Sequence, residues 1–252
     1  MTDTADGASA APGNLFLYEQ PELLTLQQHG ELGLTPSATP YAFAAGVRAV
    51  PVTLPEIFSA ARDYPVVFTN LETPFPVAVV GVLEDRNLFM QDGHWAEGRY
   101  VPAYLRCHPF AFAGERDGRV AVAVDRKAPT VTRDPKYPFF ADGKVTRETE
   151  DLMRFCAQYE AERKRTVEFC QQLKELGLLA AQRATHTPEN GGEEITLASY
   201  VSIDAEKLSA LADDAVVAMH KAGRLAAAYL QIYSLENWQR LIERRAALAA
   251  AA

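Results

Sequence analysis

Residues 146–177, TRETEDLMRFCAQYEAERKRTVEFCQQLKELG, decide the fold class of this chain. Their apolar side chains recur at steps of three and four residues, and the opposite face of this period is charged. Such a pattern is typical of an amphipathic helix that packs one face on a core. Thr146 has the spacing of a capping box relative to Thr149 or Glu150. The pattern predicts a helix of about 35 residues that begins near residue 146.

The chain before this helix has the composition of β-strands. β-Branched and aromatic residues form short runs bounded by turn-forming residues, at 64–69, 76–82, 87–90 and 120–124. Asp92-Gly93 and Asp117-Gly118 are signals for tight turns. We therefore predict a mostly antiparallel sheet of about five strands in the first half. Short helices are expected over 55–63 and after Pro102, the latter followed by a strand.

The chain after the long helix returns to a strand and then to helices. A β-branched run predicts a strand over 195–203, after a loop at 185–192. Asp204 is a suitable N-cap for the next helix, and Ser234 for the final one. The apolar run 225–233 fits either a strand or a helix. The whole pattern predicts an α+β fold, with a long amphipathic helix and a helix-rich C-terminal part packed on the sheet of the first half.

The composition predicts one folded domain behind a short tail. Residues 1–14 are small, polar and acidic, which is typical of a disordered segment. Residues 15–252 are expected to form a single domain, β-rich over 15–145 and helix-rich over 146–252. The hydrophobic share of 48% and the charged share of 23% are ordinary for a globular protein. A chain of 252 residues can bury a large core without disulfides.

The charge of the chain excludes some partners. The formal net charge is −8, from 33 acidic and 25 basic residues. Nucleic acid is not expected as a partner, because phosphate backbones are bound by clustered lysine and arginine. No basic segment precedes an apolar stretch at the N-terminus, and no run of 18 apolar residues occurs, so neither a Sec signal nor a membrane span is expected. We expect a cytoplasmic protein, with non-classical export and homo-oligomer formation left open.

The three cysteines do not predict a disulfide. Cys156 and Cys170 lie 14 positions apart on the expected helix, which is roughly 21 Å at 1.5 Å per residue and too far for a bridge. Cys107 adjoins His108, but neighbouring residues of a strand point to opposite faces. We interpret all three as reduced, buried thiols.

The sequence lacks the motifs that would identify an enzyme. Asp92 and His94, with His108, have the reverse of the order expected for a two-histidine, one-carboxylate metal site, and Asp92-Gly93 also makes a good turn. Phosphate-binding glycine loops and a G-x-S-x-G motif are absent from the sequence. We therefore predict no catalytic residue, no metal and no cofactor.

Residues 87–112, NLFMQDGHWAEGRYVPAYLRCHPFAF, form the densest aromatic block. Such a block is either core or a recognition surface, because each ring removes a large apolar area from water. If it lines a groove, the polar groups among the rings would contact a ligand. The candidate ligand-binding residues are Asn87, His94, Trp95, Arg99, Tyr104 and Arg106.

The other interpretation of this block is structural. Trp95, Tyr100 and Phe110 would then be buried in the core. Arg106 would form a bidentate ion pair with a carboxylate of the long helix, because an unpaired buried charge is costly. The carboxylates considered for this pair are Glu150, Asp151 and Glu160.

Several motifs in order resemble the SapC family of bacterial proteins. They are Tyr41-Ala42-Phe43-Ala44, residues 50–56 and 63–68, Asn87-Leu88-Phe89, Gly93-His94-Trp95, and residues 100–106 followed by Pro109-Phe110. The resemblance continues in residues 201–208 and 221–225, so it covers nearly the whole chain. The family pattern often has paired arginines before Pro-Phe, whereas in this chain Cys107 takes the second of these positions and His108 is inserted before Pro109.

The resemblance implies a bacterial protein connected with a surface array layer, or with neighbouring outer-membrane uptake and modification systems. It brings no catalytic residues with it, and the like-named peptide-transporter permease is a different protein that needs membrane spans. Two hypotheses follow. The first is a non-catalytic accessory or interaction protein. The second is a small-molecule- or peptide-binding protein, or an enzyme, that uses a pocket in the aromatic block. Convergence of Asn87, His94, Arg99, Arg106 and His108 on one pocket would favour the second.

Overall fold

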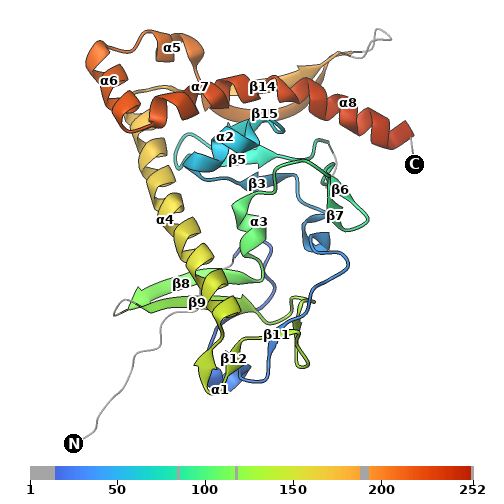
Figure 1. Cartoon of the computed structure of the whole chain (residues 1–252). Coiled ribbons are helices and arrows are strands. Elements are labelled where there is room, and N and C mark those ends of the chain that lie inside the picture. Colours follow the sequence, from blue (N-terminus) through green and yellow to red (C-terminus); the bar gives the residue numbers. More distant parts are fainter. Residues whose placement is uncertain (1–14, 84–85, 117–118, 188–192, 251–252) are drawn as a thin grey trace, which may run out of the picture. The chain divides into compact units, whose positions relative to one another are not determined.

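The computed structural model describes residues 15–83, 86–116, 119–187 and 193–250. It contains helices and several antiparallel sheets, which confirms the α+β class (Figure 1). The tail at 1–14 and the turn at 117–118, both predicted from sequence, lie outside the described residues. Within the described ranges, no helix is both long and apolar enough to cross a membrane.

The chain divides into two compact units, each built from two separate segments. Unit 1 comprises the described parts of Met1–Ala38 and Cys107–Gln158, and unit 2 those of Thr39–Arg106 and Tyr159–Ala252. The prediction of one domain over 15–252 stays a prediction.

Unit 1 is built from short antiparallel strands. One sheet has the order β1 (Pro21–Leu23), β9 (Arg119–Asp125) and β8 (Phe110–Arg116), and another β10 (Val131–Thr132), β2 (Gly33–Leu34) and β11 (Tyr137–Pro138). Helix α1 (Leu26–His29) and the pair β12 (Phe140–Ala141) and β13 (Lys144–Val145) also belong to it. The strands predicted around Phe110 and over 120–124 are β8 and β9.

Unit 2 contains a five-stranded antiparallel sheet. Its strands, in spatial order, are β14 (Leu179–His186), β15 (Ile195–Ile203), β4 (Val66–Phe68), β5 (Pro76–Val79) and β3 (Ala49–Pro51). A separate hairpin is formed by β6 (Met90–Gln91) and β7 (His94–Trp95). The helical elements are η1 (Ala42–Ala44), η2 (Leu54–Glu56), α2 (Ile57–Ala60), α3 (Ala103–Cys107), α5 (Ala205–Ser209), α6 (Asp213–Lys221), α7 (Arg224–Ser234) and α8 (Asn237–Ala250).

The predicted single sheet of about five first-half strands is wrong in its membership. β3, β4 and β5 share a sheet in which β4 also pairs with β15, a strand from after the long helix. β8 and β9 lie in a different sheet, where β9 pairs with β1. Strand existence follows from local composition, but strand pairing depends on partners far away in the sequence. The loop predicted at 185–192 also begins later, because β14 continues to His186.

The long helix α4 (Arg147–Glu175) has 29 residues and is shorter than predicted. It ends where Gly177 takes a positive φ of 66°. The Leu178 amide donates to the Leu173 carbonyl at 2.9 Å, and the Gly177 amide to the Lys174 carbonyl at 3.0 Å. These two bonds form a Schellman motif, which stops the helix although the apolar pattern continues beyond it.

Helix α7 anchors the C-terminal part of unit 2. It lies alongside β15 and α2 (Figure 1). Buried Gln231 donates to the Val66 carbonyl at 2.8 Å and accepts from the Ile203 amide at 3.1 Å. The predicted cap Ser234 is instead the last residue of α7, and its hydroxyl accepts from the Val66 amide at 2.9 Å. The 225–233 run is therefore helix, and α8 begins later, at Asn237.

Candidate functional site

Three rings of unit 2, Tyr64, Phe89 and Trp95, form a buried cluster that we call the aromatic platform. Tyr64 meets Phe89 edge-on with 4.7 Å between centroids, and Phe89 is stacked with Trp95 at 6.4 Å. The Trp95 indole N–H donates to the Tyr64 hydroxyl at 2.9 Å. That hydroxyl donates in turn to the Tyr100 carbonyl. The predicted burial of Trp95 is confirmed, as is that of Phe110, whereas Tyr100 is only half-buried.

Two of the predicted ligand-binding residues shape the backbone around the platform. Asn87 is buried, and its amide donates to the Ala44 carbonyl at 3.1 Å and accepts from the Phe89 amide at 2.9 Å. His94 is exposed, with Nδ1 3.0 Å from the Asp92 carbonyl oxygen. The turn predicted at Asp92-Gly93 is confirmed, because both residues have positive φ and connect β6 to β7.

Tyr104 and Arg106 lie on α3, next to a buried carboxylate. Glu56 accepts from the Tyr100 hydroxyl at 2.9 Å and from the Ala103 amide at 2.6 Å. Burial, followed by Glu56, raises the pKa of Tyr100 well above its usual value. Arg106 donates to the Tyr100 hydroxyl at 3.2 Å and lies over its ring at 5.7 Å. The Tyr104 ring is 6.0 Å from that of Tyr159.

The ion pair predicted between Arg106 and a carboxylate of the long helix stays a prediction. Two of the three carboxylates considered for it form ion pairs along α4. Asp151 is paired with Arg154, and Glu160 with Arg163.

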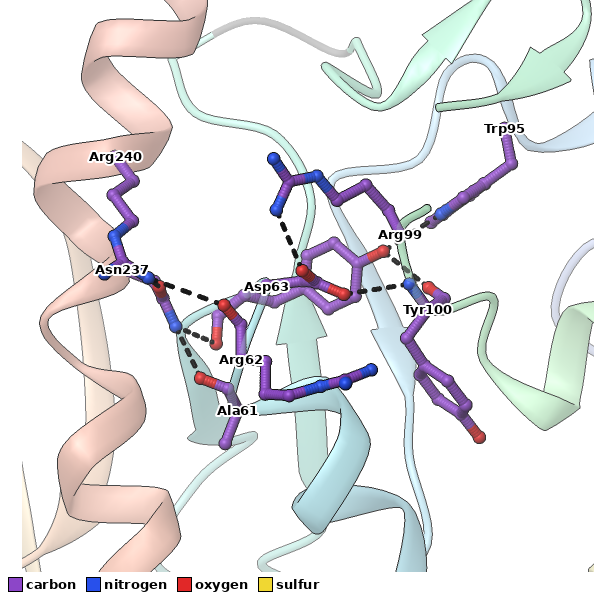
Figure 2. A network of polar contacts seen from close by, with 9 residues as sticks. Ala61, Arg62, Asp63, Trp95, Arg99, Tyr100, Asn237 and Arg240 are labelled. Carbon is purple, nitrogen blue, oxygen red and sulfur yellow. Dashed lines mark hydrogen bonds and ion pairs between the residues drawn. The ribbon is translucent and has the colours of Figure 1, made fainter. Parts of the chain in front are cut away.

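Arg99 belongs to a polar network around residues 61–64 (Figure 2). Its Nη1 donates to Asp63 Oδ1 at 3.0 Å, and the Tyr100 amide donates to Asp63 Oδ2 at 2.9 Å. Figure 2 shows Asn237 of α8 bonded to the same segment. The Asn237 side-chain amide donates to the carbonyls of Ala61 and Tyr64, at 2.8 and 3.0 Å. The segment is thus bonded to Arg99 and Tyr100 through the side chain of Asp63, and to α8 through Asn237.

Arg244 of α8 is the functional candidate that sequence analysis missed. Its Nε–H donates to the Leu88 carbonyl at 2.8 Å, and its guanidinium lies 4.6 Å above the centroid of the Phe89 ring. Burial, followed by the nearby charge of Arg99, lowers its pKa from the usual value. In the sequence Arg244 is one charge of an ordinary helical surface, Glu243-Arg244-Arg245, and nothing local links it to the aromatic block.

The candidate residues of unit 2 have different hydrogen-bond partners. Asn87 and Trp95 are internal, His94 contacts its own turn, and Arg99 and Arg106 are bonded to Asp63 and to the Tyr100 hydroxyl respectively. His108 belongs to unit 1. The ligand-binding role of the six residues stays a prediction.

Unit 1 holds a buried pair of His108 and Asp125. His108 Nε2 lies 3.7 Å from Asp125 Oδ2, and burial lowers the pKa of the imidazole. Asp125 accepts amide hydrogen bonds from Glu19 and Gln20, both at 2.9 Å, and from Lys127 at 3.1 Å. Burial acts to raise the pKa of Asp125, but these bonds together hold it below its usual value. They also tie the segment before β1 to β9. The pair has the contacts of a structural support.

Cysteine and metal chemistry receive no support from the described residues. Cys107, Cys156 and Cys170 are buried thiols that are not joined in a disulfide. Burial raises the pKa of the Cys170 thiol to about 12, so this sulfur is a poor nucleophile. Among the residues that the structure describes, no three His, Cys, Asp or Glu side chains are grouped as metal ligands.

Comparison with known proteins identifies a family but no individual relative. The family model described as SapC matches residues 24–241. No curated protein and no solved structure matches the chain.

Proposed function

The chain belongs to the SapC family, and on that premise we propose that it is a non-catalytic accessory or interaction protein in bacteria. Its role would be in cell-surface assembly or in an associated uptake or modification system. The observation that carries the proposal is a pair of tyrosines exposed on a firmly anchored helix, α7. A partner protein would bind there.

One face of α7 is fixed by packing, and the opposite face is aromatic. Ala227, Ala228 and Gln231 are buried. Tyr229 is 51% exposed and Tyr233 is 53% exposed, and residues four apart on a helix lie on one face. Tyrosine is enriched among the residues that dominate protein interfaces, because it offers a large rigid ring and a hydroxyl. The tyrosine pair is therefore suited to a protein contact.

Site-specific photo-crosslinking in the source cells tests the proposal. A benzophenone amino acid placed at position 229 or 233 is expected to give one discrete adduct with another protein. The matched control is position 137, where Tyr137 of unit 1 is 40% exposed. The Tyr229→Ser, Tyr233→Ser double variant should lose the partner while keeping its stability, since both side chains face solvent. Equal labelling at all three positions, or none at 229 and 233, would contradict the proposal.

A further inference from the structure

We propose that Arg99 and Arg244 form a binding site for a phosphate group, carried by a free small molecule or by a lipid headgroup. The site lies in unit 2, above the aromatic platform. The inference goes beyond the proposed function and uses a different surface from that of Tyr229 and Tyr233.

Arg244 is held in place by neutral groups. Its Nε–H is bonded to the Leu88 carbonyl, and the Phe89 ring supports its guanidinium from one side. Phe89 is itself buried and packed on Tyr64 and Trp95. The two terminal nitrogens of Arg244 have no acceptor within the described part of the chain. A guanidinium fixed in this way presents its remaining N–H groups without a further loss of side-chain freedom.

Arg99 is the second cation of the proposed site, and its guanidinium is bonded to the carboxylate of Asp63. Asp63 accepts from it through one oxygen only, and the other oxygen is taken by the Tyr100 amide. Asp63 is 7% exposed, whereas Arg99 is 48% exposed. The guanidinium of Arg99 therefore extends from a buried anchor towards solvent.

The two arginines flank Tyr64. Arg99 is bonded to the neighbouring Asp63, and Arg244 lies over Phe89, whose ring centroid is 4.7 Å from that of Tyr64. The positive charge of Arg99 also contributes to the lowered pKa of Arg244, after burial. More positive charge is nearby. Arg240 lies one turn before Arg244 on α8, and it donates to Asn237 Oδ1 at 2.9 Å and to the Arg62 carbonyl at 3.5 Å (Figure 2). Of the carboxylates in the described ranges, only Asp63 forms an ion pair with Arg99, Arg240 or Arg244. Three arginines thus share one paired carboxylate in a chain whose net charge is −8.

A phosphate group matches this arrangement. It carries about −1.5 to −2 charges at neutral pH and several acceptor oxygens. Guanidinium groups bind such oxygens through paired N–H donors. When two guanidinium groups face one anion, their attraction to the anion offsets their repulsion of each other. The aromatic platform holds the guanidinium of Arg244 in position, and Asp63 holds that of Arg99.

Calorimetric titration of the full chain with inorganic phosphate, in a low-salt buffer free of other oxyanions, tests the site. Flotation with phosphatidylcholine vesicles that contain phosphatidic acid tests the lipid source. Arg99→Gln should weaken binding roughly tenfold or more, because a charged donor is lost. Arg244→Lys keeps the positive charge but removes the paired N–H donors of the guanidinium, so it should weaken binding several-fold. The matched control is Arg165→Gln, which removes an exposed arginine paired with Glu162 on α4 and should leave affinity unchanged.

The outcomes separate the alternatives. Phosphate binding that Arg99→Gln weakens supports the site with a free ligand. Vesicle binding alone, with the same sensitivity, supports it with a lipid headgroup. Binding of neither probe, or equal affinity in Arg99→Gln and Arg165→Gln, would overturn the proposal. A loss of crosslinking at Tyr229 and Tyr233 would bear only on the proposed partner contact.

Discussion

Two carboxylates of unit 2, Glu56 and Asp63, hold the same residue in different ways. Glu56 is buried and accepts four hydrogen bonds, from the Thr53 amide and hydroxyl, the Tyr100 hydroxyl and the Ala103 amide. Asp63 accepts from the Tyr100 amide and from the guanidinium of Arg99. Glu56 thus accepts from the hydroxyl of Tyr100, and Asp63 accepts from its backbone amide.

The two carboxylates differ in the kind of group that donates to them. All four donors to Glu56 are neutral groups of the fold, so its charge is used entirely to join η2 to the start of α3. The Arg99 partner of Asp63 extends into solvent, where it can meet another anion. We call Glu56 the closed carboxylate, because all its donors belong to the fold, and Asp63 the open carboxylate, because its cation Arg99 is half exposed. A closed carboxylate contributes to stability, whereas an open one leaves its cation available to bind a ligand. The following predictions test this contrast, from the largest expected effect to the smallest.

Loss of the aromatic platform should have the largest effect. Trp95→Ala removes a buried indole and leaves the Tyr64 hydroxyl without its donor. We expect the free energy of unfolding to fall by about 3–5 kcal/mol, as for other large-to-small core substitutions. Urea denaturation followed by circular dichroism measures it. A loss below about 1 kcal/mol would place Trp95 outside the core.

Removal of the closed carboxylate should come second. Glu56→Gln replaces one acceptor oxygen by a donor, so that at least one of the four donors, three of which are buried, loses its acceptor. We expect a loss of about 2–3 kcal/mol, because an unsatisfied buried group retains its full desolvation cost. The same denaturation assay applies. Equal losses for Glu56→Gln and Asp63→Asn would remove the contrast between the two sites.

The third contact to Tyr100, from the Tyr64 hydroxyl, predicts a dependence on alkaline pH. Burial, as the main cause, raises the pKa of Tyr64 well above its usual 10.0. The stability that comes from keeping this phenol protonated is therefore complete below pH 10 and is lost as pH rises further. Between pH 8 and 11 the wild-type protein should lose about 1 kcal/mol more than Tyr64→Phe. Identical pH profiles for the two proteins would refute the assignment.

Removal of the open carboxylate should have the smallest effect on folding. Asp63→Asn weakens an ion pair whose cation is half exposed, and such pairs contribute roughly 0.5 kcal/mol. The same change removes a negative charge beside Arg99, so phosphate affinity should rise a few-fold. Calorimetry on the folded variant measures this. Weaker phosphate binding, with stability intact, would show that Asp63 positions Arg99 more than it neutralises it.

Much of the secondary structure could be predicted because its causes are local. The strand over 195–203 and the N-cap at Asp204 were both correct, and the cap accepts from the amides of Glu206 and Lys207. The start of α4 and the Asp92-Gly93 turn also depend on residues only a few positions apart. Ser234 shows the limit of this reasoning. It is a good cap by residue type, yet its hydroxyl is bonded to Val66 of β4.

The candidate site was less predictable, because residue type says little about which partner a side chain meets. Asn87 and Trp95 looked like ligand contacts, but their polar atoms are bonded to Ala44, Phe89 and Tyr64. Arg99 was singled out among the aromatics, whereas Arg244 was not, although Arg244 lies over the Phe89 ring and Arg99 is bonded to Asp63, next to Tyr64. A cation in a charged helix has no sequence signal that marks it as facing an aromatic cluster.

Periodicity and composition therefore determined the α+β class and elements such as the 195–203 strand, because hydrophobic repeats, caps and turns act over a few residues. The family resemblance came from the ordered motifs. Only the tertiary structure decided which strands share a sheet, which carboxylate is closed, and which arginines stand together. Those features join Leu88 to Arg244 and Asp63 to Arg99 across long stretches of chain. Long-range packing and hydrogen bonding select such partners, and no local pattern encodes the choice.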